Sequence, residues 1–425
     1  MHLGGARAIP VLILTFSVFF YAYHKLEYIL LIVLSILVNY ALASYLVRPE
    51  VSKLPKCRKL IVTVDVLFNL ILLGYFKYSY FIVGEINYVT GSEFDLAAVA
   101  LPLAISFYTF QQIGYVIDVS RDSKRHTALF NYSLFVFFFP QLIAGPICNS
   151  RELIPQLPRL YVGRHLQSNF IIGISIIAIG LFKKSVIADG IASYSDPIFL
   201  LAEQGVEIGF FDAWGAALAF TFQIYFDFSG YSDMAVGLAR LFGIRLPINF
   251  FSPYKANSVI DFWRRWHITL SRFLRDRIYL PLGGNRTGLV RRYSNLLTVM
   301  VLGGIWHGAG WTFVLWGALH GCYLIVNHLF RAIYRMGDRP IEIAAARGLT
   351  FFAVVIAWIL FRAETVSGAL ELYAGMFGFN GVQIPLRLAL ELGLPPTGVP
   401  ELGISVGLTS LRDLAGMYLI LIAVW

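Results

Sequence analysis

Charged residues are scarce in this sequence and make up only 14% of its 425 residues. Soluble globular proteins carry about 25% charged residues, whereas 58% of this chain is hydrophobic even without its glycines. With a mean hydropathy of +0.69, the chain cannot bury its apolar side chains in water, which excludes a water-soluble enzyme. Because one transmembrane helix takes about 20 apolar residues, the sequence predicts an all-α polytopic membrane protein with about 9–11 crossings.

Cysteines and the common cofactor motifs are also missing or few. Cys57, Cys148 and Cys322 lie far apart, without the paired spacing of a disulfide framework or a zinc site. The sequence has no Walker-type phosphate loop, no Rossmann glycine fingerprint and no metal-spaced His/Cys cluster. It also lacks the G-x-S-x-G elbow of serine hydrolases. We therefore expect no metal and no bound cofactor.

The net charge of +9 predicts basic cytoplasmic loops rather than nucleic-acid binding. The apolar runs Ile9–Tyr23 and Tyr28–Val47 predict a helical hairpin, because no cleavage site follows the first run. The stretch Arg48–Lys59 holds five Lys and Arg and is expected in the cytoplasm. Glu85–Asp95 holds acids but no Lys or Arg, so we expect it outside.

The sharpest change of charge lies in the middle of the chain. Residues 185–239 contain no Lys or Arg in 55 residues, whereas Arg245–Arg292 contains ten against two acids. The positive-inside rule therefore predicts a basic cytoplasmic segment over about residues 244–292.

Three breaking residues, Pro140, Gly145 and Pro146, interrupt the apolar run Phe130–Ile147, which has basic residues on both flanks. Irregular backbone at membrane depth is tolerated only where it is buried in protein or lines a wet cavity. This favours a re-entrant hairpin beside a central site. A Pro-kinked span followed by a basic outer loop is the alternative.

The segment Tyr225–Asp233 follows an apolar helix and carries Asp227, Ser229 and Asp233. Acids near a membrane segment are costly and are usually functional, paired or water-facing. The segment is therefore a candidate part of a site, with a solvated helix end at the outer surface as the alternative.

The segment Asp261–Asp276 is predicted as one helix with two faces. The Asp261/Arg265 and Arg272/Asp276 pairs have ion-pair spacing. The pattern predicts either an amphipathic helix lying on anionic lipid or a basic platform that presents a histidine to an anionic substrate, such as the phosphates of a nucleotide-bearing donor. The apolar stripe is Trp263, Trp266, Leu270 and Phe273, and the polar face is Arg264, His267, Ser271 and Arg275.

His307 lies in the sequence GGIWHGAGW, within 35 residues (293–327) that carry no Asp, Glu, Lys or Arg. A titratable group at membrane depth is expensive and typically lines a cavity, and histidine suits acid–base work near neutral pH. Glycines allow close backbone approach and local unwinding. A functional histidine is favoured over a hydrogen-bonded core residue. His320 has a weaker claim, and His328 is expected at the membrane boundary.

Phe262–Arg286, which contains WRRWH, and Gly303–Gly321, which contains WHG, resemble the signatures of the membrane-bound O-acyltransferase (MBOAT) family. Within it, the bacterial alginate O-acetylation branch is most similar, and D-alanyl transfer proteins of teichoic acid are more distant. The resemblance extends over about residues 101–364. Its supporting stretches are Ser106–Val119, Pro140–Ile147, Gln223–Phe250 and Ile359–Glu364.

The resemblance implies one integral membrane domain over residues 1–425, a ring of transmembrane, re-entrant and interfacial helices around a central tunnel. It implies a catalytic His307 with His267 in support. Further expected site residues are Asp227, Ser229, Asp233, Trp306 and Trp263 as supporting or tunnel-lining groups, and Arg264, Arg265 and Arg275 as donor-binding groups.

The expected activity moves an acetyl group from a cytoplasmic thioester, acetyl-CoA, across a bacterial inner membrane for O-acetylation of an extracytoplasmic polysaccharide such as alginate. The acceptor is the glycan itself or a periplasmic partner of the SGNH-hydrolase type, next to a polysaccharide export complex.

One alternative is a transporter or flippase of an anionic lipid-linked sugar, which predicts a pseudo-symmetry of broken helices that we do not find. Another is a non-catalytic scaffold, which would tolerate loss of both histidines. The last apolar run, Met417–Trp425, is too short to cross a membrane, which departs from the further spans of the family.

Overall fold

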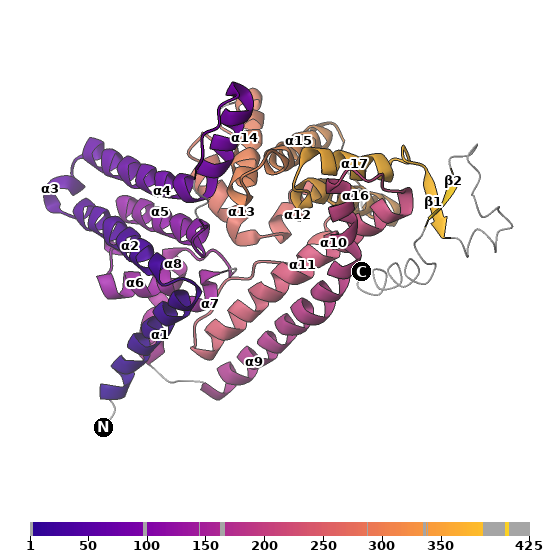
Figure 1. Ribbon diagram of the computed structural model, residues 1–425. Helices are drawn as coiled ribbons and strands as arrows, with labels where there is room; N and C mark the ends of the chain where they lie inside the picture. Colours follow the sequence, from indigo (N-terminus) through magenta and orange to yellow (C-terminus); the bar gives the residue numbers. More distant parts are fainter. Residues whose placement is uncertain are drawn as a thin grey trace. The chain divides into compact units, whose positions relative to one another are not determined.

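The computed structural model (Figure 1) describes residues 3–96, 100–143, 145–161, 166–286, 288–334, 337, 339–385 and 404–407. The expected all-helical fold class is confirmed. One small exception is a parallel pair of strands, β1 (Val382–Pro385) and β2 (Ile404–Gly407). The final run Met417–Trp425 lies outside the described residues.

The α-helices are α1 Leu3–His24, α2 Glu27–Leu46, α3 Pro49–Ser52, α4 Pro55–Thr90, α5 Ile105–Arg121, α6 Leu129–Phe137, α7 Phe139–Leu142, α8 Ser150–Leu153, α9 Leu166–Phe182, α10 Asp189–Glu203, α11 Phe210–Leu241, α12 Val259–Arg265, α13 Ile268–Leu274, α14 Leu289–His307, α15 Trp311–Ile333, α16 Pro340–Arg362 and α17 Val366–Met376.

Shorter helices of other types connect these elements. Three are 3-10 helices: η1 (Ser123–Arg125), η2 (Ile154–Tyr161) and η4 (Pro253–Lys255). Two are π-helices: η3 (Lys183–Ala188) and η5 (Arg275–Tyr279).

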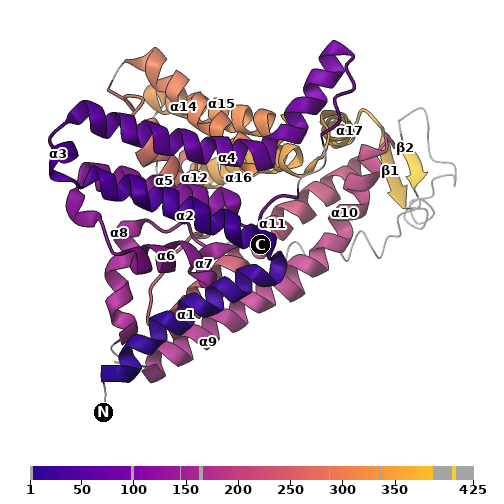
Figure 2. The same cartoon turned by 60° about the vertical axis from the view of Figure 1, so that its left-hand side comes forward.

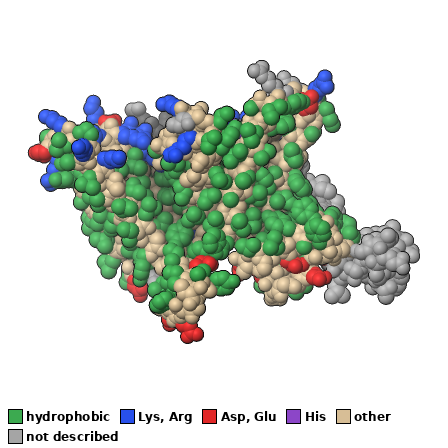
Figure 3. Space-filling model, turned by 90° about the horizontal axis from the view of Figure 1, so that it is seen from above, with side chains coloured by type: hydrophobic (Ala, Val, Ile, Leu, Met, Phe, Trp, Pro, Cys, Tyr) green, Lys and Arg blue, Asp and Glu red, His purple; other side chains and the backbone are tan. Residues whose placement is uncertain are grey.

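Five helices in the described part of the chain are long and apolar enough to cross a membrane. Hydrophobic side chains cover much of the surface in view in Figure 3. Such an apolar exterior is stable only against lipid, so the chain is a polytopic membrane protein. The number of nine to eleven crossings stays a prediction. The five helices span Glu27–Leu46, Pro55–Thr90, Gln167–Glu203, Trp311–Ile333 and Pro340–Arg362.

The chain forms two compact units, each assembled from three separate stretches. Unit 1 contains residues 1–180, 231–249 and 267–273, and unit 2 contains residues 181–230, 250–266 and 274–425. The single domain, the ring of helices and its central tunnel stay predictions.

The core of unit 1 contains polar groups that join its membrane helices. α1 and α2 are the two consecutive helices predicted for the N-terminus. Asn39 of α2 and Asn69 of α4 exchange amide hydrogen bonds (2.8 and 3.4 Å). Gln112 of α5 donates to Ser35 Oγ (2.8 Å) and accepts from Tyr132 Oη of α6 (3.1 Å). Interhelical hydrogen bonds of this kind hold helices together where lipid offers no hydrophobic driving force.

The predicted break around Pro140 is confirmed in unit 1. α6 has nine residues and rises about 14 Å, well short of the roughly 30 Å hydrocarbon core. Protein groups satisfy the backbone around the break: Gln141 Nε2 of α7 donates to Phe135 O of α6 (2.8 Å), and Ile147 N, which follows α7, donates to Thr269 Oγ1 (3.0 Å). Both groups are buried in protein, as irregular backbone at this depth requires. The direction in which the chain leaves the membrane stays a prediction.

In unit 2, α14 and α15 form a tight helical hairpin, and Figures 1 and 2 show them side by side. A methyl group added at Gly304 would lie 2.2 Å from Phe313 O, and one at Gly317 would lie 2.4 Å from Met300 O. Only glycine permits backbones to approach this closely, as at other small-residue contacts between membrane helices. The charge-free run over residues 293–327 lies within this hairpin.

Candidate active site

His307 is the last residue of α14, at the turn into α15. Its imidazole is half-buried and makes edge-on contacts with three rings, those of Trp306 (centroids 4.9 Å apart), Trp316 (5.2 Å) and Phe361 (5.1 Å). Trp306, named above as a supporting or tunnel-lining group, is one of these rings, and Trp316 and Phe361 are partners that the sequence did not single out. Aromatic rings on several sides restrict the orientation of the imidazole.

The glycine that follows His307 makes the turn compact. A methyl group at Gly308 would lie 2.0 Å from a ring carbon of Phe313, and the Phe313 ring in turn contacts Phe361 (5.4 Å). Because the turn has no room for a side chain at this position, the imidazole is carried on rigid elements instead of a loose loop. Rigid support is what a catalytic group requires.

His267 lies where the predicted helix over residues 261–276 is broken, which is a correction. α12 ends at Arg265, Trp266 is extended, and His267 adopts a left-handed conformation with φ of +42° before α13 begins. The physical reason is local capping. Oδ1 of Asn249 accepts hydrogen bonds from His267 Nδ1 (3.1 Å), Thr269 N (3.2 Å) and Thr269 Oγ1 (2.9 Å).

The break separates the two predicted faces of the segment. Trp263 and Trp266 belong to unit 2, whereas Leu270 and Phe273 belong to unit 1, so the continuous apolar stripe does not form. His267 is only 1% exposed, so it does not stand on an exposed basic platform. Burial lowers the pKa of its imidazole to about 3, which leaves the ring neutral at pH 7.

The basic residues of this segment have mixed surroundings. Arg264 and Arg275 are exposed, as donor-binding groups must be. Arg265 Nε forms the expected ion pair with Asp261 Oδ1 (3.0 Å). The expected Arg272–Asp276 pair is wrong. Arg272 Nη1 instead contacts Glu152 Oε1 (3.0 Å), and Arg275 Nε contacts Asp276 Oδ1 (2.7 Å).

The polar segment 225–233 lies within α11 and not at a helix end, which corrects the solvated-end alternative. Asp227 Oδ1 pairs with Lys184 Nζ (2.9 Å), and the same ammonium contacts Asp189 Oδ1 (2.5 Å). Lys184 belongs to the π-helix η3, an irregularity that is frequent at functional sites. The sequence missed Lys184 because it lies far from Asp227 along the chain.

Ser229 and Asp233 lie further along α11. Ser229 is buried, and its hydroxyl has no hydrogen-bond partner among the described residues. Six residues turn a helix through about 600°, so the carboxylates of Asp227 and Asp233 point about 120° apart. The two acids therefore do not form a carboxylate pair.

The structure brings some of the expected site residues together within unit 2. Trp263 contacts Trp316 (5.8 Å), which contacts His307, so the WRRWH and WHG motifs share one aromatic cluster. His267 and Asp233 belong to unit 1.

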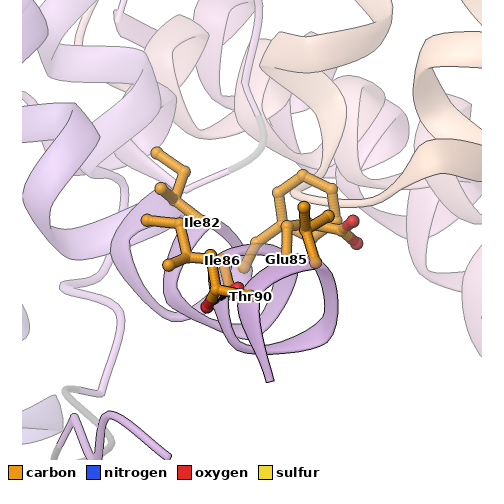
Figure 4. A pocket seen from close by; sticks show the side chains of 6 residues that line it. Ile82, Glu85, Ile86 and Thr90 are labelled. Atoms are coloured by element: carbon orange, nitrogen blue, oxygen red, sulfur yellow. Dashed lines mark hydrogen bonds between the residues drawn. The ribbon is translucent and has the colours of Figure 1, made fainter. Parts of the chain in front are cut away.

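A surface hollow on α4 does not compete with this site. It is lined by residues of that helix alone, and Figure 4 shows Ile82, Glu85, Ile86 and Thr90 projecting from it. A single carboxylate on one helix face offers no nucleophile–base pair. Among the described residues, no three His, Cys, Asp or Glu side chains gather as a possible metal site.

An all-helical membrane protein with a histidine held at the end of a glycine-rich hairpin is a candidate for acid–base or acyl-transfer chemistry within the bilayer. The chain belongs to the MBOAT, membrane-bound O-acyltransferase, family, whose model matches residues 120–362. It is therefore a membrane O-acyltransferase.

Its similarity to individual members extends over most of the chain. It is 42% identical over 395 residues to the peptidoglycan O-acetyltransferase of Helicobacter pylori, which covers 87% of this chain and 73% of that protein. It is 39% identical over 419 residues to the probable alginate O-acetylase AlgI of Pseudomonas putida, covering 97% and 84%. The teichoic acid D-alanyltransferase of Streptococcus thermophilus is 29% identical over 235 residues, covering 53% and 56%. The expected resemblance to the alginate O-acetylation branch is confirmed.

Proposed function

We propose that this chain takes an acetyl group from acetyl-CoA in the cytoplasm and passes it across the bacterial inner membrane for O-acetylation of an extracytoplasmic polysaccharide such as alginate. The names of the alginate and peptidoglycan relatives support an acetyl group and a glycan as final acceptor. The direct acceptor is a glycan hydroxyl or a hydroxyl of a periplasmic SGNH-type partner, which then serves the export complex. No resident cofactor or metal takes part.

The observation that carries this proposal is the rigid aromatic setting of His307 in a stretch without charged residues. In the reaction, a ring nitrogen of His307 takes the proton of the acceptor hydroxyl as the oxygen attacks the thioester carbonyl carbon. The C–S bond then breaks, and the leaving thiolate receives that proton from the imidazolium. Surrounding aromatic groups exclude water, which would otherwise hydrolyse the thioester.

The remaining expected groups have supporting roles in this proposal. The exposed guanidinium groups of Arg264 and Arg275 bind the donor phosphates, for which arginine offers several N–H donors. His267, neutral and held by Asn249, supports the backbone break in the WRRWH segment and does not act as a cation. Asp227, Ser229 and Trp263 are supporting groups of unit 2, and Asp233 is a polar group of unit 1.

A His307→Ala variant tests the proposal. The variant is expressed in cells that lack the native gene, and the acetate that alkali releases from surface polysaccharide is measured. We expect this acetate to fall at least about 10²-fold, since a catalytic general base contributes roughly that much to the rate. The protein should still insert and purify at wild-type yield. The matched control is His328→Ala, because His328 on the same hairpin contacts Arg292 (2.8 Å) and lies outside the aromatic cluster. Normal acetylation by His307→Ala would contradict the assignment.

A second measurement concerns the donor. Purified protein in lipid nanodiscs should release free thiol from acetyl-CoA in the presence of deacetylated alginate or membranes that contain the partner. A flippase or a scaffold would leave acetyl-CoA intact, and so would a transferase that uses another donor. Thiol release with His328→Ala but not with His307→Ala would support both donor and base.

A further inference from the structure

His320 is a buried histidine whose two ring nitrogens have no hydrogen-bond partner among the described residues. It lies on α15, and its side chain is 0% exposed. Five aromatic residues enclose it: Phe262, Trp263, Trp316, Tyr323 and Trp358. A buried polar group without a partner costs free energy, so an imidazole at this position requires an explanation.

Two further orphaned donors belong to rings that pack against His320. The indole Nε1 atoms of Trp263 and Trp316 are also buried and without a partner in the described part of the chain. The three rings contact one another, with centroids 5.1 Å apart for Trp263 and His320, 4.9 Å for Trp316 and His320, and 5.8 Å for Trp263 and Trp316. By contrast, Nε1 of the neighbouring Trp358 donates to Tyr254 Oη (3.2 Å). Burial in this aromatic cluster therefore does not by itself leave an indole N–H without a partner.

The chemistry of the three side chains matches one small oxygen-bearing ligand. An indole N–H is a donor only, whereas a neutral imidazole offers one donor and one acceptor. A water molecule can accept from both indoles and donate to the imidazole, which meets the two to four partners that a buried water typically has.

Trp316 connects this group of three to His307. Its ring meets His307 edge-on at 5.2 Å and His320 at 4.9 Å. A hydrogen bond at its Nε1 would therefore restrict the ring that packs directly on His307.

We propose that His320, Trp263 and Trp316 bind one buried water molecule, and that this water anchors the Trp316 indole and so positions His307 for acyl transfer. The inference rests on the proposed role of His307 as the base. His320 is a positioning residue, since it acts through Trp316 and does not touch the reacting atoms.

The first experiment compares His320→Phe with His320→Gln in the acetyl-CoA thiol-release assay. Phenylalanine keeps an aromatic ring and removes the orphaned nitrogens, so thermal stability should be kept or improved. We expect kcat to fall about 10²-fold, as misplacement of a catalytic group typically does, with KM for acetyl-CoA within twofold of wild type. His320→Gln, which retains a donor and an acceptor, should recover about tenfold of that loss by the same positioning argument.

The matched control His328→Phe should retain wild-type kcat. A stable His320→Phe protein with unchanged kcat would overturn the proposal, as would failure of glutamine to rescue.

A double-mutant cycle tests the coupling through the water. Trp316→Phe keeps an aromatic ring at this position, removes the indole N–H and should lower kcat in the same way. If one water connects both residues, the double variant should be no slower than the slower single variant, because interacting sites are non-additive. Losses that multiply would overturn the coupling.

A direct structural measurement applies whether or not the variants fold or the transfer assay succeeds. A cryo-EM map of the wild-type protein at about 2 Å resolution should show a density peak within hydrogen-bond distance, about 2.7–3.2 Å, of nitrogens from at least two of the three side chains. No peak would overturn the water site. Loss of thiol release in the wild type, with the peak present, would instead count against the proposed function alone.

Discussion

Asn249 is the residue whose single amide oxygen supports the break at His267. This oxygen accepts from the His267 ring and twice from Thr269, and all three residues are buried. Asn249→Ala would leave those donors without a partner, and a buried unsatisfied donor costs about 1–3 kcal/mol. We expect a loss of about 2 kcal/mol of unfolding free energy, measured by thermal or denaturant unfolding in detergent. The control Asn87→Ala removes hydrogen bonds at an exposed helix end, where substitutions typically change stability by about 0.5 kcal/mol or less. Equal stability of both variants would contradict the capping role.

At the residue scale, sequence patterns identified His307 because they are local. The histidine stands out in a charge-free run between glycines and tryptophans. Asn249, Lys184 and Trp316 were not identified, because their importance comes from partners on other elements. An asparagine in an irregular stretch or a lysine within a helix has no unusual pattern of its own.

The α14–α15 hairpin depends on glycines at its contact face. Gly304→Ala or Gly317→Ala would force a methyl group to within 2.2 or 2.4 Å of a backbone oxygen. The helices would separate, and overpacking of this kind typically costs about 1–3 kcal/mol. We expect a lower melting temperature and reduced acyl transfer, because His307 and Trp316 are carried on the two helices. In the matched control Gly84→Ala on α4, no atom lies within 4 Å of the added methyl, so helix propensity should stabilise the protein by roughly 0.5–1 kcal/mol. Alanine tolerated at 304 and 317 as well as at 84 would show that close approach is not needed.

At the element scale, helices were predicted well and their interruptions less well. Proline and glycine predict the break after α6, because their own backbone conformations interrupt a helix. The break at His267 was missed because WRRWHITLSRF has a good helical pattern. Capping by Asn249 and burial of Trp266 in unit 2 overcome that pattern, and neither can be seen within the segment itself.

The whole molecule carries a charge pattern that predicts its orientation. Cys57 is exposed at the start of α4, within the basic stretch expected in the cytoplasm. A membrane-impermeant maleimide should therefore label Cys57 in inside-out vesicles but not in intact cells, in a Cys322→Ser background. Cys148 should stay unlabelled, because it is buried and burial raises the pKa of its thiol. The control Glu93→Cys, with Cys57 replaced by serine, should show the opposite sidedness. Labelling of Cys57 from outside would reverse the orientation.

Composition and hydropathy alone determined that this is a helical membrane protein, because apolar side chains must face lipid and a helix satisfies its own backbone. Motif sequence likewise indicated the family and the histidine at its centre. Only the tertiary structure decided which other rings pack against that histidine: Trp316 and Phe361. Such contacts depend on packing between segments that are distant in sequence, and the free energy of that packing has no local signature.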